Sequence, residues 1–128
     1  MNLLDTHTLA WAVNEPERLS SAARHIIEDS EYWVSAASLW EMLLKRNKPR
    51  PVVPGDPLAW WRRYVVNGGI RVLAIEWPHI SHLDTLPAPT KDPFDRILVC
   101  QCIAESFRLV TKDSLIRDYY QGHVHCVW

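Results

Sequence analysis

Five acidic residues stand at positions in this chain where their side chains could meet and do chemistry. They are spread over most of the sequence: Asp5, Glu41, Asp92, Asp95 and Asp113. Two carboxylates at about 5 Å repel each other by roughly 3 kcal/mol at an effective dielectric of about 20. A divalent cation relieves this repulsion, and sites rich in oxygen favour Mg²⁺ or Mn²⁺. Such an ion binds a phosphate oxygen and activates water, so the pattern favours phosphodiester hydrolysis.

Short apolar runs alternate with helical patterns along the chain. The runs at 2–4, 32–34, 70–75 and 109–110 predict buried strands, and 123–127 predicts a further strand at the edge. Helices are predicted from 6 to 11, 22–28, from Ser35 or Ser38 to about Lys45, and at 58–66, 78–85 and 92–107. Strands that are apolar on both faces are typical of a parallel sheet covered by helices on both sides. We therefore expect one α/β domain over residues 1–128.

The acids occupy one predicted edge of that sheet, where open α/β folds bind their ligands. Asp5 directly follows the first strand, and Asp113 lies three residues after Val110. Asp92 and Asp95 fall in the first turn of the helix that precedes the strand at 109–110, while Glu41 lies one to two turns into the helix after the second strand. This placement predicts that the five carboxyls converge, although the sequence leaves the strand order open.

Each acid also has a structural interpretation. Asp92 can cap the helix that Pro93 begins, and Asp95 suits the positive end of the same helix. Glu41 follows Ser38 at capping-box spacing, and Asp113 can cap a short helix starting at Ser114. Asp5 is the hardest to explain structurally, because a bare carboxylate at the end of a buried strand costs several kcal/mol unless it is paired or bound to metal.

Composition narrows the class of protein. The chain has 128 residues, of which 48% are apolar and 23% charged, and its formal net charge is −1. It is too apolar to be disordered, it has no run of about 18 apolar residues, and no basic segment resembling a signal peptide precedes Asp5. Of its 15 acids and 14 bases, ten acids remain once the five above are set aside, so the surface outside the acidic site is mildly basic and permits a polyanionic substrate.

Four motifs in this order resemble those of a PIN domain, and in particular the VapC-type toxins of bacterial toxin–antitoxin pairs. They span nearly the whole chain, together with the final Val127-Trp128: Leu3-Leu4-Asp5-Thr6-His7, Val34-Ser35-Ala36-Ala37-Ser38-Leu39-Trp40-Glu41, Asp92-Pro93-Phe94-Asp95-Arg96-Ile97-Leu98 and Leu109-Val110-Thr111-Lys112-Asp113. The resemblance implies a PIN-like three-layer α/β/α sandwich with a short-stranded, mainly parallel sheet. It also implies a cytoplasmic, Mg²⁺- or Mn²⁺-dependent endoribonuclease toxin that cuts RNA, is inhibited by a small antitoxin, forms a homodimer and does not contact membranes.

The resemblance also assigns roles to residues of this sequence. It implies an acidic metal site of four residues, with Asp5 and Asp95 as the most direct ligands and Glu41 and Asp113 holding the same ion, a second ion or the attacking water. The resemblance makes Asp92 a supplementary catalytic acid. Asp92 and Asp95 are one helical turn apart, and the sequence leaves open which of them faces the ion. Further candidates are hydroxyls that orient the carboxylates, Thr6 and Thr111, and a cation that contacts phosphate or pairs with an acid, Arg96.

Several features outside the acids have two interpretations. The loop at 87–91 departs from close relatives, which often carry histidine and arginine there, and leaves Lys91 as its only cation. A basic group could track an RNA backbone or simply face solvent: Lys45, Arg46, Lys48, Arg50, Arg62 and Arg63. Trp60, Trp61 and Tyr64 form an aromatic ridge, which suits either a partner interface or core packing.

Other candidate sites and functions are disfavoured. The cysteines and histidines at 100, 102, 123, 125 and 126 point in different directions on a helix or a strand, which predicts free thiols rather than a zinc site. His7 lies next to the proposed acidic site, where a local hydrogen-bonding role is favoured over acid–base catalysis. Two alternative functions remain: a catalytically silent PIN scaffold that binds RNA or protein, and a phospho-acceptor receiver domain. The receiver domain fits poorly, because Asp5 stands alone and Glu76-Trp77 follows Ile75.

Overall fold

The central element is a sheet of short parallel strands. The computed structural model describes residues 1–88 and 92–128. In that part of the chain the strands are β1 (Asn2–Leu4), β2 (Tyr32–Ser35), β3 (Arg71–Leu73), β4 (Arg108–Val110) and β5 (Cys126–Val127). They pair in the order β3-β2-β1-β4-β5, and every pairing is parallel. Receiver domains follow the order 2-1-3-4-5, so this topology excludes that alternative.

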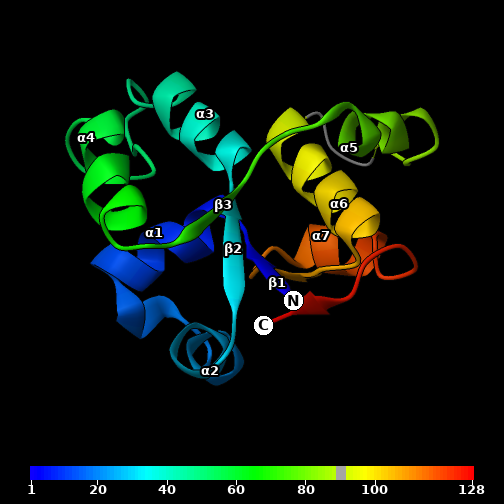
Figure 1. The fold of residues 1–128 in the computed structure, drawn as a ribbon, viewed down its shortest axis with the longest axis horizontal. Coiled ribbons are helices and arrows are strands. Elements are labelled where there is room, and N and C mark those ends of the chain that lie inside the picture. Colours follow the sequence, from blue (N-terminus) through cyan, green and yellow to red (C-terminus); the bar gives the residue numbers. More distant parts are fainter. Residues whose placement is uncertain (89–91) are drawn as a thin grey trace.

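Helices cover both faces of the sheet, as the alternating pattern predicted. In Figure 1, α1 (Thr6–Asn14), α2 (Ser21–Asp29) and α4 (Pro57–Trp61) lie on one side. On the other side lie α5 (Trp77–Ser81), α6 (Pro93–Glu105) and α7 (Ser114–Tyr119). The helix α3 (Ala36–Leu44) follows β2, and the single turns η1 (Pro16–Arg18), η2 (Arg62–Val66) and η3 (His82–Asp84) extend or link the helices. The predicted α/β/α sandwich is therefore confirmed.

The register brings three strand ends level with one another. Leu4 pairs with Val34 of β2 and with Val110 of β4, and the next backbone N–H, that of Asp5, donates to the carbonyl oxygen of Val110 at 3.0 Å. Because β1 is the central strand, the residues that follow β1, β2 and β4 leave the sheet side by side. This edge therefore gathers segments that are far apart in the sequence.

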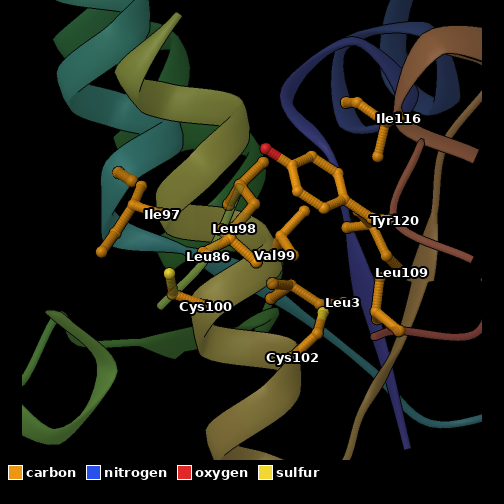
Figure 2. Close-up of a cluster of buried hydrophobic side chains, with 12 residues drawn as sticks. Leu3, Leu86, Ile97, Leu98, Val99, Cys100, Cys102, Leu109, Ile116 and Tyr120 are labelled. Atoms are coloured by element: carbon orange, nitrogen blue, oxygen red, sulfur yellow. The ribbon is translucent and has the colours of Figure 1, made fainter. Parts of the chain in front are cut away.

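Two apolar cores, one on each face, fix the helices against the sheet. Figure 2 shows the core beneath α6, where Leu98, Val99 and Cys102 meet Leu3 of β1 and Leu109 of β4. The opposite core contains Leu4 and Val110 from the same two strands, together with Val34 of β2, so β1 and β4 are buried on both faces. This explains why the strands are continuous apolar runs instead of alternating patterns.

Several predicted elements are shorter than their apolar patterns. The strand predicted at 70–75 covers only 71–73, because the N–H of Ile70 still bonds to the carbonyl oxygen of Val65 in the preceding turn. The strand predicted at 123–127 covers only 126–127, since the N–H groups of His123 and Val124 bond to the carbonyl oxygen of Tyr120. The helices predicted at 58–66 and 78–85 each change to a different helical turn partway, η2 and η3.

The aromatic ridge turns out to be part of the core. Trp60 and Trp61 are each only 5% exposed, and the indole N–H of Trp60 donates to the side-chain oxygen of Asn14 at 2.9 Å. These two tryptophans therefore anchor α4 against α1 and do not form an exposed partner surface. The three cysteines are free thiols, as predicted, and among the described residues no helix has the length and apolar content needed to span a bilayer.

Candidate functional site

A cavity of about 430 Å³ opens at the edge of the sheet where β1, β2 and β4 end. All five predicted acids line it, and they reach it from the end of β1, from α3, from the start of α6 and from the loop after β4. The rest of the lining is His7, Trp11, Lys45, Lys112 and Ser114. Five carboxyls from four separate segments thus meet in one concave surface.

Asp5 is the most constrained of these acids. It is the N-cap of α1, and its Oδ1 accepts from the backbone N–H of Thr8 at 2.8 Å. The hydroxyl of Thr111 donates to its Oδ2 at 2.5 Å, which is the orienting role predicted for Thr111. Burial raises the pKa of Asp5, because desolvation disfavours the charged form more than these hydrogen bonds favour it. Its carboxyl is therefore fixed in position at the floor of the cavity.

Glu41 is almost fully buried and faces a cation on its own helix. The ammonium of Lys45, one turn along α3, lies 2.6 Å from Glu41 Oε2 and 3.4 Å from Asp92 Oδ2. Burial lowers the pKa of Lys45, but the hydrogen bond and negative charge of Glu41, together with Asp92, outweigh it, so the pKa is raised overall. Lys45 therefore stands between two of the acids as a positive charge supplied by the protein itself.

The capping-box interpretation of Glu41 is wrong. The N-cap of α3 is Ser35, whose hydroxyl accepts from the N–H of Ala37 at 3.0 Å. Ser38 is instead buried inside the helix and shares a hydrogen bond of 2.9 Å with the hydroxyl of Thr6. Thr6 was predicted to orient a carboxylate, but its hydroxyl bonds to the hydroxyl of Ser38 instead.

Asp92 and Asp95 both line the cavity, in different ways. Asp92 caps α6, because its Oδ1 accepts from the N–H of Phe94 at 2.9 Å, while its Oδ2 faces Lys45. Asp95 lies one turn further on, among the other acids. Burial and the charges of Asp92, Glu41, Asp113 and Asp5, in that order, raise the pKa of Asp95 to about 7. Asp95 is thus the carboxyl on which the repulsion of the site converges.

Asp113 combines a capping role with a place in the cavity wall. It is the N-cap of α7, and its Oδ1 accepts from the N–H groups of Leu115 (2.9 Å) and Ile116 (3.2 Å). The hydroxyl oxygen of Thr111, which donates to Asp5, also accepts from the N–H of Asp113 at 3.1 Å. Thr111 therefore couples the loop after β4 to the carboxyl after β1.

Most of the basic residues that were predicted to contact RNA lie outside the cavity. Arg96 does not line the cavity, and its guanidinium donates to the carbonyl oxygen of Leu86 at 3.5 Å. Of the six basic residues predicted to track RNA or face solvent, only Lys45 reaches the cavity; the other five are exposed elsewhere. Lys91, the only cation of the loop at 87–91, lies outside the described residues.

Sequence reasoning missed part of the lining. Lys45 was grouped with surface cations, although its position four residues after Glu41 on a helix is the spacing of a neighbouring ion pair. Trp11 was missed as well; it lies four residues after His7 on α1, with ring centroids 5.9 Å apart, and His7 itself was already placed next to the site. Lys112 and Ser114 flank Asp113, so their presence follows once the loop after β4 is placed at the site.

The arrangement is chemically suited to a divalent cation. Burial and, after it, four like charges raise the pKa of Asp95, and an internal ammonium already stands between Glu41 and Asp92. Both observations indicate a surplus of negative charge that a cation relieves. No three His, Cys, Asp or Glu side chains of the described residues are already arranged around a single point, so holding an ion requires the carboxylates to turn toward one another.

Comparison with known sequences gives a consistent result. The model of a protein family described as "PIN domain" matches residues 3–121 of this chain. Ribonuclease VapC22 of Mycobacterium tuberculosis is 30% identical over 127 residues, which is 98% of this chain and 97% of that protein.

Solved structures share the fold at low sequence identity. VapBC2 of Rickettsia felis, bound to a DNA fragment from its promoter, matches with a TM-score of 0.63 and 11% identity, over 98% of this chain and 96% of that chain. A toxin–antitoxin complex from Klebsiella pneumoniae has a TM-score of 0.63 at 14% identity, covering 100% and 97%. FitAB bound to the IR36 DNA fragment has a TM-score of 0.60 at 16% identity, covering 99% and 94%.

Proposed function

Because this chain belongs to the PIN-domain family, we propose that it is an endoribonuclease that acts as the toxin of a toxin–antitoxin pair. The observation that carries the proposal is the convergence of five carboxyls from four segments in one cavity. Similarity to a ribonuclease along nearly the whole chain supports RNA as the substrate. The reaction is hydrolysis of a phosphodiester bond with Mg²⁺ or Mn²⁺ as cofactor.

In this proposal four acids hold the ion, and Asp5 and Asp95 are its most direct ligands. Glu41 and Asp113 complete the site, and Asp92 acts as the supplementary catalytic acid. A bound ion would lower the pKa of a water molecule and offset charge on the phosphate and the leaving oxygen. Thr111 holds Asp5 in one orientation, and the backbone N–H groups of α7 do the same for Asp113. The chain thus limits the freedom of its carboxyls before any ligand arrives.

Lys45 balances the charge of this site. Its ammonium neutralises Glu41 and Asp92 in the absence of another cation, and its pairing with two acids leaves Asp95 as the carboxyl most in need of a positive partner. If a bound ion took its place beside these acids, Lys45 would be free to contact a phosphate of the substrate.

A small antitoxin and a second copy of the chain are the expected protein partners. The solved structures with this fold include complexes of toxins with antitoxins. Exposed apolar side chains offer contact surfaces, and they include Trp40 and Leu44 on α3 and Trp77 and Ile80 on α5. The free thiols fit a cytoplasmic protein.

The test is cleavage of an unstructured RNA by the purified protein with Mg²⁺, compared with EDTA and with Asp5→Asn. We expect cleavage with Mg²⁺ only, and loss of at least about 100-fold in Asp5→Asn, since changes to mere outer partners of a metal site already cost about 10- to 100-fold. The control is Asp84→Asn, an exposed acid outside the cavity. Cleavage that survives both EDTA and Asp5→Asn would contradict the mechanism, and a wild-type protein that binds but never cuts RNA would favour the silent scaffold.

A further inference from the structure

The cavity has a second part that the proposed metal chemistry does not use. Besides the acids and Lys45, its lining contains His7 and Trp11 of α1, and Lys112 and Ser114 from the loop after β4 and the start of α7. Two aromatic rings and a cation beside an acidic catalytic pocket are a combination that recognises something other than a metal ion.

Trp11 is held firmly yet remains partly accessible. Trp128 packs against it edge to face at 5.9 Å between centroids, and His7 lies tilted at 5.9 Å. Two cations lie over its ring: Arg18, with Cζ 4.7 Å from the centroid, and Lys112, with Nζ at 5.7 Å. Unlike Trp60 and Trp61, which are buried in the core, Trp11 keeps part of its surface in the cavity.

These groups match the chemistry of an unpaired nucleotide. Aromatic rings stack on the faces of bases, and nearby lysine or arginine side chains neutralise the adjoining phosphates. Lys112 is exposed and directly precedes the proposed metal ligand Asp113, so a phosphate near the metal also lies near this cation. In a duplex the base faces are already covered by their neighbours, so such a shelf selects single strands.

We propose that Trp11, with His7 and Lys112, holds the nucleotide next to the cleaved phosphate. The base stacks on the Trp11 ring beside His7, in the place over the ring that the Lys112 ammonium occupies without RNA, and Lys112 turns to the phosphate of that nucleotide. This inference rests on the proposed ribonuclease function and adds to it a positioning site outside the carboxylates. Trp11 takes no part in the bond cleavage itself.

The first test compares Trp11→Leu with wild type on an unstructured oligoribonucleotide that the wild type cuts with Mg²⁺. We expect KM to rise about 5- to 150-fold, the range of stacking one base, with kcat nearly unchanged. Trp11→Phe keeps a ring and should remain close to wild type. Tyr119→Leu is the control at another aromatic side chain, because Tyr119 is 48% exposed and lies outside the cavity.

The second test changes the RNA and leaves the protein intact, so it holds even if Trp11→Leu fails to fold. An abasic nucleotide is placed on the 5′ side of the cleaved phosphate and, in a separate oligonucleotide, on the 3′ side. One of the two should raise the wild-type KM by the same factor as Trp11→Leu, and combining it with Trp11→Leu should add little.

The outcomes separate the two levels of the proposal. If wild type does not cut RNA with Mg²⁺, the proposed function fails. If wild type cuts but both abasic substrates behave normally, the function stands and the stacking site is overturned. The stacking site is overturned as well if the abasic change and Trp11→Leu each raise KM and their combined effect is the product of the two. A Trp11→Leu protein that loses affinity for an antitoxin while its KM for RNA is unchanged would also overturn it.

Discussion

In the described part of the chain, two of the buried polar regions differ in how their charges are compensated. At the contact between α5 and α6, His79 is only 1% exposed and both of its ring nitrogens are satisfied. Nδ1 accepts from the N–H of Glu76 at 3.0 Å, which leaves Nε2 to carry the proton and donate to Glu105 at 2.8 Å. In the acidic cavity, by contrast, five acidic side chains face one another, and Lys45 pairs with only two of them.

The difference distinguishes structural polar groups from groups kept for a ligand. A buried polar group that stabilises the fold has its partners within the fold. The cavity instead retains repulsion that is relieved only when something positive binds. Four changes would sharpen or break this contrast, and they are taken in order of expected size.

Replacing His79 should have the largest effect on stability. His79→Ala leaves the N–H of Glu76 without its acceptor and a void between α5 and α6, so we expect a loss of about 2–4 kcal/mol in the free energy of unfolding. Chemical denaturation with and without Mg²⁺ measures it. Glu105→Gln, at a side chain 40% exposed, should cost much less. If added Mg²⁺ restored the stability of His79→Ala, the two regions would not be independent.

The metal-free protein should lose stability as the pH rises. Asp95 has a pKa of about 7 in the fold against a usual value of 3.8, so its contribution is full below pH 3.8 and is lost as the pH rises to about 7. The loss is about 2 kcal/mol, roughly half of what the shift alone implies, because solvent screens a half-buried carboxyl. Thermal unfolding in EDTA across this range should show the slope, and Asp95→Asn should flatten it. An unchanged slope in Asp95→Asn would remove Asp95 from the centre of the repulsion.

Removing the hydroxyl that orients Asp5 should weaken metal binding. Thr111→Val deletes the donor to Asp5 Oδ2, and we expect the affinity for Mn²⁺ to fall about 10-fold, the lower end for an outer partner of a metal ligand. Titration calorimetry measures it. Thr6→Val is the matched control, since the Thr6 hydroxyl bonds to Ser38 and to no acid. Equal losses in the two variants would indicate a general packing effect.

The smallest expected effect is at Lys45. Lys45→Met removes the internal cation and should destabilise the metal-free protein by about 1 kcal/mol, because the pair with Glu41 is only partly buried. Mg²⁺ should restore stability more in Lys45→Met than in wild type. Lys48→Met, on an exposed lysine outside the cavity, should change neither value. A metal-free Lys45→Met that is as stable as wild type would contradict the role of Lys45 as the balancing charge.

The sequence was most informative about residues that both cap a helix and line the cavity. Asp92 and Asp113 both signal a helix start and both stand in the cavity, so a local rule located residues of the site. The buried strands were equally visible, because each is apolar on both faces. Strand order was not predictable, since pairing depends on contacts between distant segments such as β1 and β4.

Other features depended on neighbours that periodicity does not reveal. Trp60 and Trp61 looked like a possible exposed ridge, but α1 and the sheet cover them. Glu41 looked like half of a capping box until Ser35 proved to be the cap. Lys45 looked like one surface cation among six, because its second partner, Asp92, is 47 positions away. The errors at the two tryptophans and at Lys45 arise because residues far away in the sequence pack against these side chains.

The central position of β1 has a consequence for the synthesis of the protein. A ribosome makes this strand before any of its partners, and β4, which borders it on one side, follows roughly a hundred residues later. Thr111, which fixes Asp5 in place, is 106 positions downstream of it. A nascent chain therefore cannot assemble a complete acidic pocket until nearly all of this sequence has emerged from the exit tunnel. Such long-range closure is slow to form, so the acidic pocket is among the last parts of the protein to assemble.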